Sequence, residues 1–290
     1  MFAIGKEKTK WRDSAWKEVI SDCPRSAIEF LMPDLAADMA DDMKPVRKLD
    51  GISGRELHSK GTDSDRGMLV NDLFFNIPML DGECGNIAFF IEQMHEKSDE
   101  LPRRVFDTFV RLREKLRLRT TCLVIFTGSS PNMNTYVETC YGCEVTMKYR
   151  TYYLPEKSAD ELRADKRPFA PVMLAGRLAL DAGDDIKLRE KYAAEIHATT
   201  PKSEERMFII DFARRIFKVD DPEISKELKE VYELETMPLE EYRKQIRLDN
   251  ARIETLEEVA ISLLEDGMPL QQVAKHTRLP IEELQKMKPH

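Results

Sequence analysis

The hydrophobic and polar positions of the first half of the chain alternate between helical and strand-like spacing. Apolar residues at helical spacing predict an amphipathic helix over residues 13–23. Residues 68–80 and 85–92 are rich in β-formers, and the Asp-Gly pair that begins at residue 81 is typical of a hairpin turn. Pro78 lies near this turn and favours an edge or a bulge at that end of the first strand.

The pattern beyond the hairpin predicts a helix and then another strand. Residues 98–119 have apolar positions on one side of a helical wheel, and residues 120–128 form an apolar run that predicts a buried strand. The order is therefore helix, strand, strand, helix, strand. From about residue 156 onward, long helical patterns rich in charge predict a mainly helical region that ends in three short helices.

Composition narrows the class of protein. The 290 residues are 42% hydrophobic and 34% charged, and no run approaches the roughly 20 apolar residues of a membrane helix. The N-terminus does not resemble a signal peptide, and five scattered cysteines suit a reducing compartment, so we expect a cytoplasmic protein without a membrane partner. The net charge of −8 weighs against a protein that coats nucleic acid, although a local basic face is compatible with it.

Two carboxylates lie on the predicted hairpin at similar distances from its turn. Asp72 lies in the first strand and Glu92 ends the second, both among apolar residues. Antiparallel pairing brings such positions close together, and two carboxylates at a strand end suit Mg²⁺. Spacing alone favours the ordinary alternative, in which both side chains are solvated or lie at an edge.

Several motifs occur in an order that resembles a known family. They are DSAWKEVI (13–20), IEFLMPDL (28–35), NDLFFNIPMLDGE (71–83) and IEQMHEKSDELPRRVFDTF (91–109). Together they resemble the recombination-promoting nuclease/putative transposase family, which belongs to the PD-(D/E)XK nucleases. The resemblance covers about residues 13–150.

The resemblance implies a fold, an activity and a set of site residues. The implied fold is α/β, with a mixed sheet flanked by helices over residues 10–155 and a mainly helical region over residues 156–290. The implied activity is Mg²⁺- or Mn²⁺-dependent cleavage of DNA, with Asp72 and Glu92 as metal ligands. Glu56 matches an acidic position of the family and would add a ligand or orient a water.

The third position of the nuclease motif departs from the family. Met94 stands where the wider fold has lysine and this family usually has glutamine. A thioether neither donates a hydrogen bond nor carries positive charge. Losing one such contact commonly costs about 2.7–4 kcal/mol of transition-state stabilisation. The rival hypothesis is therefore a catalytically degenerate nuclease fold that serves as a DNA-binding or assembly protein.

The helix predicted after the hairpin is strongly basic. Arg104, Arg111 and Lys115 fall close together on a helical wheel, beside the apolar side. With the resemblance in view, they are candidates for contact with the DNA backbone. The alternative is an ordinary solvated helix face whose long side chains cover apolar surface.

Two further features carry weaker predictions. The C-terminal tail resembles a helix-turn-helix but is acidic over residues 254–290, so we interpret it as a packing or homo-oligomerisation element rather than a reader of DNA. Cys140 and Cys143 form a single C-x-x-C without a second ligand pair, which argues against a zinc site. The residues around Cys143 predict a strand.

Overall fold

The protein is described here by a computed structural model. It describes the backbone of residues 14–40, 47–48, 73–81, 84–92, 100–128, 133–236, 239, 256, 259–264, 266–277 and 284. The chain divides into two compact units, Met1–Glu235 and Thr236–His290. None of the helices in the described ranges is long and apolar enough to cross a membrane.

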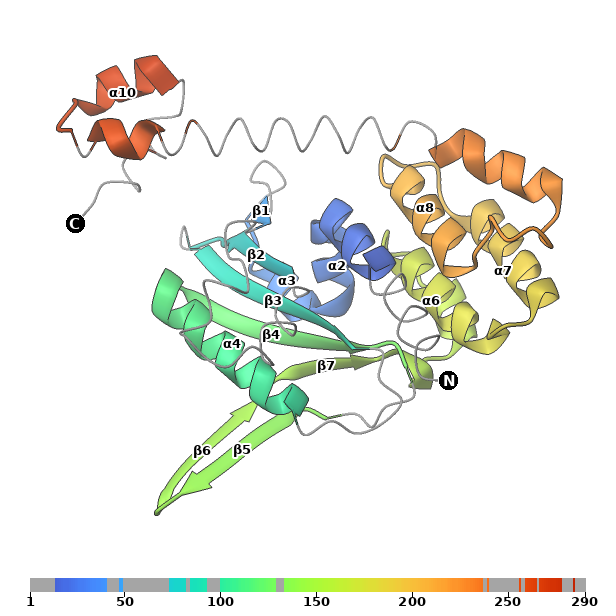
Figure 1. Cartoon of the computed structure of the whole chain (residues 1–290), viewed down its shortest axis with the longest axis horizontal. Helices are drawn as coiled ribbons and strands as arrows, with labels where there is room; N and C mark the ends of the chain where they lie inside the picture. The colour runs from blue at the N-terminus through green and yellow to red at the C-terminus, as the bar shows by residue number, and fades with distance from the viewer. Residues whose placement is uncertain are drawn as a thin grey trace. The chain divides into compact units, whose positions relative to one another are not determined.

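A mixed sheet forms the centre of the first unit (Figure 1). Among the described residues its order is β1-β2-β3-β4-β7, with the first three strands antiparallel and the last three parallel. The strands are β1 (Arg47–Lys48), β2 (Leu73–Pro78), β3 (Cys84–Glu92), β4 (Arg119–Phe126) and β7 (Arg150–Tyr153). Helix α4 (Glu100–Leu116) connects β3 to its parallel neighbour β4.

The predicted hairpin and the strand after it are confirmed. β2 and β3 pair from Leu73↔Phe89 to Pro78↔Cys84, and β4 is buried from Cys122 onward. The expectation for Pro78 is only partly met, because it is the last paired residue of β2 and not a bulge. Its carbonyl accepts a hydrogen bond from the amide of Ala40, so this end of β2 is covered by the segment after α3.

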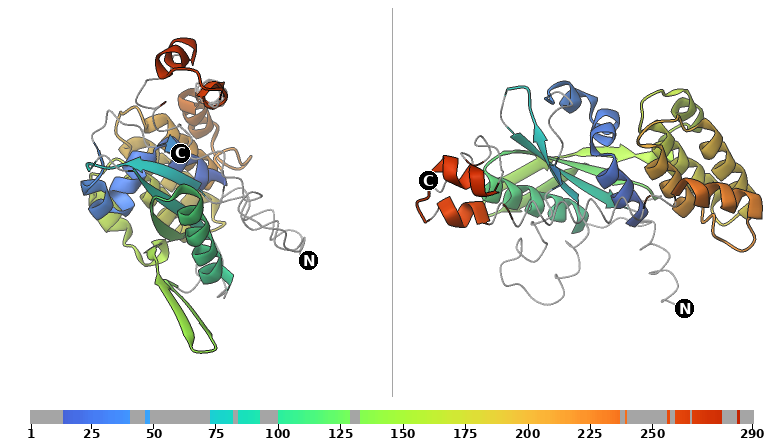
Figure 2. Two further views of the ribbon diagram at one scale, coloured as in Figure 1. Left: turned by 90° about the vertical axis from the view of Figure 1, so that its left-hand side faces the viewer. Right: turned by 90° about the horizontal axis from the view of Figure 1, so that it is seen from above.

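Helices cover both faces of the sheet. On one face, Val105 and Leu112 of α4 share a buried cluster with Phe74, Val124 and Phe126. On the other face lie α2 (Pro24–Leu31) and α3 (Pro33–Ala37), and the ring of Phe30 meets that of Tyr152 at 6.0 Å. Figure 2 shows α4 and the α2–α3 pair on opposite sides of the strands.

The helix predicted near the N-terminus occupies residues 14–22 of the described chain. Trp16, Val19 and Ile20 are buried, as their spacing predicts. The ring of Trp16 packs edge-on against Phe212, with 4.8 Å between ring centroids. It also lies directly over Gly176, where no side chain separates the ring from the helix backbone. The N-terminal helix is therefore packed against helices far along the chain.

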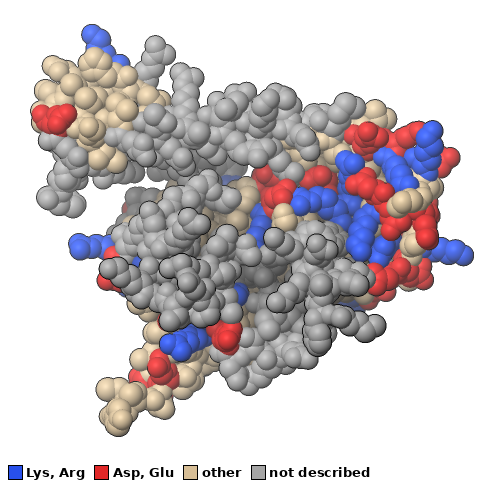
Figure 3. All heavy atoms as spheres, viewed as in Figure 1, with Lys and Arg blue, Asp and Glu red and all other residues tan. Residues whose placement is uncertain are grey.

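Helices follow the sheet, as the charged periodic pattern predicts. They are α5 (Ala159–Ala164), α6 (Ala170–Ala182), α7 (Ile186–Thr199) and α8 (Arg206–Ile216). A short turn separates α6 from α7. Gly183 ends α6 at a φ of 53°, and Asp185 caps α7 by accepting a hydrogen bond from the amide of Leu188. Figure 3 shows acidic and basic side chains interleaved over these helices.

Polar contacts fasten these helices to the N-terminal part of the unit. Arg215 of α8 donates to both carboxylate oxygens of Glu18, and Ser26 of α2 donates to both oxygens of Glu205 at 2.7 and 2.8 Å. Arg150 of β7 makes a two-pronged contact with Asp34 of α3, which lowers the pKa of that carboxyl to about 2. The boundary predicted near residue 155, between a nuclease-like domain and a helical region, stays a prediction. Residues on both sides of it belong to the same compact unit.

The strongly charged composition of residues 219–235 is typical of a solvated helix, and the structure departs from that pattern. Residues 226–236 are helical, but Tyr232 is fully buried and donates to the carbonyl oxygen of Ala193 at 2.8 Å. The side of this helix that carries Tyr232 therefore packs against α7. Most of its exposed positions are charged, although Val231 and Leu234 are exposed as well.

The second unit has a small core of its own. Ala260, Val273 and Leu284 are buried, and Leu263 and Leu270 pack against them. α10 (Leu270–Thr277) follows a break at Gly267, whose φ is 80°. Two of the three predicted short helices lie within the described residues, and of the third only Leu284, which is helical, is described.

Candidate functional site

The candidate site lies at the edge of the sheet where β2 begins and β3 ends. Leu73 opens β2 and pairs with Phe89, and β3 continues for three more residues to Glu92. Glu92 stands opposite Phe126, the last residue of the parallel strand β4. The start of β2 and the carboxyl ends of β3 and β4 thus share one edge of the sheet.

Of the predicted metal-site residues, only Glu92 belongs to the part of the chain that the structure describes. The backbone of Glu92 is the last position of β3, and its side chain is outside the description. Asp72, Glu56 and Met94 lie outside the described residues. The pairing of two carboxylates and the Mg²⁺ that they would hold stay predictions. Within the ranges that the structure describes, no group of three or more His, Cys, Asp or Glu could hold a metal ion.

Helix α4 carries the predicted basic residues. It follows the end of β3 and leads back to the start of its parallel neighbour β4, so Lys115, near the C-terminus of α4, lies toward the opposite end of the sheet from Glu92. Its buried stripe consists of Leu101, Val105, Thr108 and Leu112, which spacing places on one side of the helix. Arg104 and Arg111 are partly buried along one flank of this stripe. Lys115 belongs to the same helix, and its side chain is outside the description.

The opposite flank of α4 is occupied by a second, smaller sheet. Phe106 stacks on Tyr136 with 4.6 Å between ring centroids and 15° between planes. Phe106 lies about 200° around the helix from Arg104, at 100° per residue. The two arginines are therefore on the flank of α4 that faces away from β5 (Thr135–Cys140).

The contact between α4 and the sheet holds two buried hydroxyl groups. Thr108 and Tyr149 have buried oxygens for which no hydrogen-bond partner exists in the described structure. Burial raises the pKa of Tyr149 to about 12, so this phenol stays protonated at neutral pH. These groups belong to the packed interior, and we assign neither of them to the candidate site.

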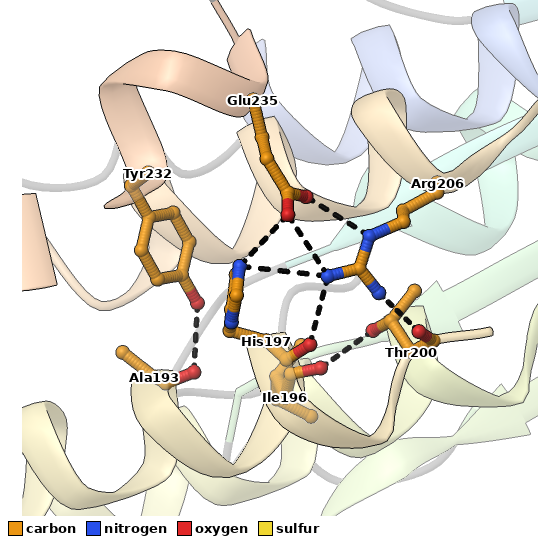
Figure 4. A network of polar contacts seen from close by, with 7 residues as sticks. All are labelled: Ala193, Ile196, His197, Thr200, Arg206, Tyr232 and Glu235. Carbon is orange, nitrogen blue, oxygen red and sulfur yellow. Dashed lines mark hydrogen bonds and ion pairs between the residues drawn. The ribbon is translucent and has the colours of Figure 1, made fainter. Parts of the chain in front are cut away.

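A polar network that the sequence did not suggest lies elsewhere in the first unit (Figure 4). Glu235 accepts from Nε of Arg206 at 2.9 Å, and its other oxygen lies 2.9 Å from Nε2 of His197. Arg206 also donates to the carbonyl oxygens of His197 and Thr200. Burial opposes the charged form of Glu235, but the hydrogen bonds from Arg206 and His197 outweigh it and lower its pKa.

This network joins three helices and leaves its charged groups satisfied. Its members come from α7, from α8 and from the helix at 226–236. A basic and an acidic group that neutralise each other, with two helix-end carbonyls bound, are what helix packing requires. We interpret the network as an anchor for the helix at 226–236. Sequence spacing could not reveal this network, because His197, Arg206 and Glu235 are separated by 9 and 29 positions.

Cys140 and Cys143 lie apart from the candidate edge. Cys140 ends β5, and Cys143 begins β6 (Cys143–Lys148). The strand predicted around Cys143 is therefore confirmed. Both are exposed and neither is in a disulfide, whereas Cys23 and Cys122 are buried.

No protein-family model, curated protein or solved structure matches this chain.

Proposed function

We propose that this protein is a metal-dependent DNA endonuclease of the PD-(D/E)XK type. The observation that carries the proposal is the hairpin edge together with its crossover helix. The start of β2 and the end of β3 share one edge, and α4 then runs to the parallel strand β4. This arrangement is the helix, strand, strand, helix, strand order that the sequence motifs imply.

The proposed roles follow from the chemistry of the residues. Carboxylate oxygens are the donors that Mg²⁺ prefers, so Asp72 and Glu92 would hold the ion and Glu56 would assist. The ion would activate water and neutralise charge on the phosphodiester. Arg104, Arg111 and Lys115 would bind the DNA backbone from the flank of α4 that is turned away from β5.

Met94 supports a second candidate function, which is DNA binding or assembly without cleavage. Its thioether cannot replace the charge or hydrogen bond of lysine or glutamine at this position. A protein that kept the fold and the basic helix would still bind DNA after losing turnover. The two candidates differ in turnover and share the DNA contact.

Cleavage of supercoiled plasmid tests the first candidate. We expect nicking in Mg²⁺ or Mn²⁺, loss of nicking with EDTA, and loss of nicking in Asp72→Ala. Glu227→Ala is the matched control, because this carboxylate is exposed on the helix at 226–236 and should leave activity unchanged. Absence of metal-dependent cleavage at high protein concentration, or equal cleavage by Asp72→Ala, would refute the nuclease.

Restoring the polar residue separates the two candidates. If wild type is inactive, Met94→Gln or Met94→Lys should create metal-dependent cleavage only where the remaining site is intact. A gain of about 10²–10³-fold is expected for recovering one such transition-state contact. DNA binding without cleavage in both variants would favour the non-catalytic function.

The basic flank of α4 has its own test. Alanine at Arg104 and Arg111 should weaken DNA binding at every sequence, and each lost phosphate contact should reduce the salt slope by about 1. Lys226→Ala is the control, because Lys226 is an exposed base outside α4. Fluorescence anisotropy with a labelled duplex at several salt concentrations measures both quantities. An unchanged salt slope in the double variant would exclude this flank as the DNA contact.

A further inference from the structure

The hairpin formed by β5 and β6 stands out from the rest of the first unit. Figures 1 and 2 show it as a two-stranded arm beyond α4. Its strands pair with each other from Thr135↔Lys148 to Cys140↔Cys143, in a sheet separate from the central one. Its base is anchored, because Tyr136 stacks on Phe106 and the amide of Tyr149 donates to the carbonyl of Asn134.

The tip of this arm holds two thiols in fixed register. Tyr141 and Gly142 form the turn, with φ values of 46° and 83°. Two successive left-handed residues are what a tight two-residue hairpin turn requires. Cys140 and Cys143 flank the turn as direct partners, so their side chains project from the same face of the arm. Both are exposed and neither is in a disulfide.

Two thiols in this arrangement are half of a soft-metal site. Directly opposed strand residues have Cβ atoms about 4.5–5.5 Å apart, which allows two sulfurs to bind one ion. Zn²⁺ takes four ligands in a tetrahedron, at about 2.3 Å for sulfur, and C-x-x-C is a common ligand pair. Among the described residues of one chain, no third His, Cys, Asp or Glu is near enough to form a metal-binding group with them.

We propose that Zn²⁺ joins two copies of this chain tip to tip, with Cys140 and Cys143 of each copy as its four ligands. Binding releases one proton from each of four thiols to solvent, and the resulting thiolates coordinate the ion without any oxidation. The second pair that one chain lacks is supplied by an identical tip. This inference is independent of the proposed cleavage of DNA.

The surroundings of the tip favour a second copy as the partner. Val145 is exposed on the same face of the arm as the thiols, and Tyr141 of the turn is fully solvent-accessible in the isolated chain. Apolar side chains in such positions gain from being covered. Glu138 lies two positions before Cys140 on the same face of the arm, and its carboxylate adds negative charge that attracts a divalent cation. The anchored base leaves the tip unobstructed by α4.

Metal titration of the full chain, reduced with a non-thiol reductant, tests the proposal. We expect one Zn²⁺ per two chains and a doubling of the 33.6 kDa molar mass in light scattering, reversed by EDTA. Co²⁺ serves as the spectroscopic probe, because thiolate-to-cobalt charge-transfer bands identify sulfur ligation. A hard oxygen site at the candidate nuclease edge produces no such bands.

Variants at the tip complete the test. Cys140→Ser and Cys143→Ser should each abolish the charge-transfer bands and the metal-dependent dimer. Tyr141→Ser keeps both thiols and should keep the bands and the stoichiometry. One metal per chain without a change in mass would overturn the proposal, as would bands that persist in Cys140→Ser. A chain that forms only an internal Cys140–Cys143 disulfide and binds no metal when reduced would overturn it too.

Discussion

At the scale of single residues, the indole ring of Trp16 lies close against the backbone of Gly176. A Cβ added to Gly176 would lie 2.4 Å from Cζ2 and 2.7 Å from Cη2 of the indole ring. Alanine normally stabilises the interior of a helix relative to glycine by about 0.5–1 kcal/mol. Here the steric clash outweighs that gain, because the ring is fully buried and cannot move aside.

We therefore expect Gly176→Ala to lower the free energy of unfolding by about 1–3 kcal/mol. Urea unfolding followed by tryptophan fluorescence measures the change. Trp16→Phe removes the two clashing ring atoms, so Gly176→Ala should cost less in that background than in wild type. Equal costs in the two backgrounds would show that the ring does not limit this position.

The sequence predicted one side of this contact and missed the other. Helical spacing identified Trp16 as buried, because periodicity reports which face of a helix is apolar. It could not identify Gly176 as the partner, since the two residues are far apart in the chain and glycine has no hydrophobic signature. Local patterns predict burial, and the pairing of buried faces is set by the tertiary fold.

At the scale of elements, the helix at 226–236 is rich in charge and is nevertheless packed against other helices of the first unit. Tyr232 fills a buried position and Glu235 binds Arg206 and His197 across to α7 and α8. Burial works against the charge on Glu235, yet the hydrogen bonds hold its pKa below the ordinary 4.5. A carboxyl with a depressed folded pKa stabilises the fold above its unfolded pKa and loses that contribution as the pH falls through the folded value.

We expect Glu235→Gln to destabilise the first unit at pH 7 by about 1–2 kcal/mol, the scale of a partly exposed charge-assisted pair. The difference from wild type should shrink as the pH falls below about 4.5, where the unfolded chain begins to protonate this carboxylate, and should be lost as the pH falls through the lower pKa of the folded state. Urea unfolding at several pH values measures this dependence.

Glu233→Gln is the matched control, because Glu233 is exposed on the same helix. It should be near neutral at every pH. If Glu233→Gln and Glu235→Gln behave alike, or if the effect of Glu235→Gln is unchanged at low pH, the anchor carries no pH-dependent stability.

The sheet illustrates which elements a pattern can predict. β2, β3 and β4 are apolar runs of 6, 9 and 8 residues, long enough to leave a clear signal. β1 and β7 have only 2 and 4 residues and were missed. Their positions follow from pairing, as β7 extends the parallel side beside β4 through Leu123↔Arg150. Short strands are defined by their neighbours more than by their own sequence.

At the scale of the whole molecule, the proposed site depends on elements that converge from separate parts of the chain. Motif order predicted the hairpin, α4 and β4, and the described pairing agrees with those elements. The carboxylate pair of Asp72 and Glu92 stays a prediction, because strand pairing fixes backbone register and does not by itself create a metal site. The self-association proposed for the C-terminal region also stays a prediction.

The two compact units give rise to a prediction about independent unfolding. The second unit's core is small, with Val273 fully buried beside Ala260 and Leu284. A domain of this size has little apolar area to spare, so one buried charge is enough to unfold it. Both tryptophans of the chain, at positions 11 and 16, belong to the first unit, so fluorescence reports on that unit alone.

Val273→Asp should therefore lower the helical signal in circular dichroism while leaving the midpoint of the tryptophan fluorescence transition unchanged. Gln272→Asp places the same charge at an exposed position of α10 and should alter neither signal. A fluorescence midpoint that falls along with the loss of helix would mean that the units stabilise each other. An unchanged midpoint would mean that the sheet, α4 and the candidate edge fold without help from the C-terminal unit. The same variant then shows whether self-association requires the folded tail, since a dimer that persists in Val273→Asp must be held elsewhere in the chain.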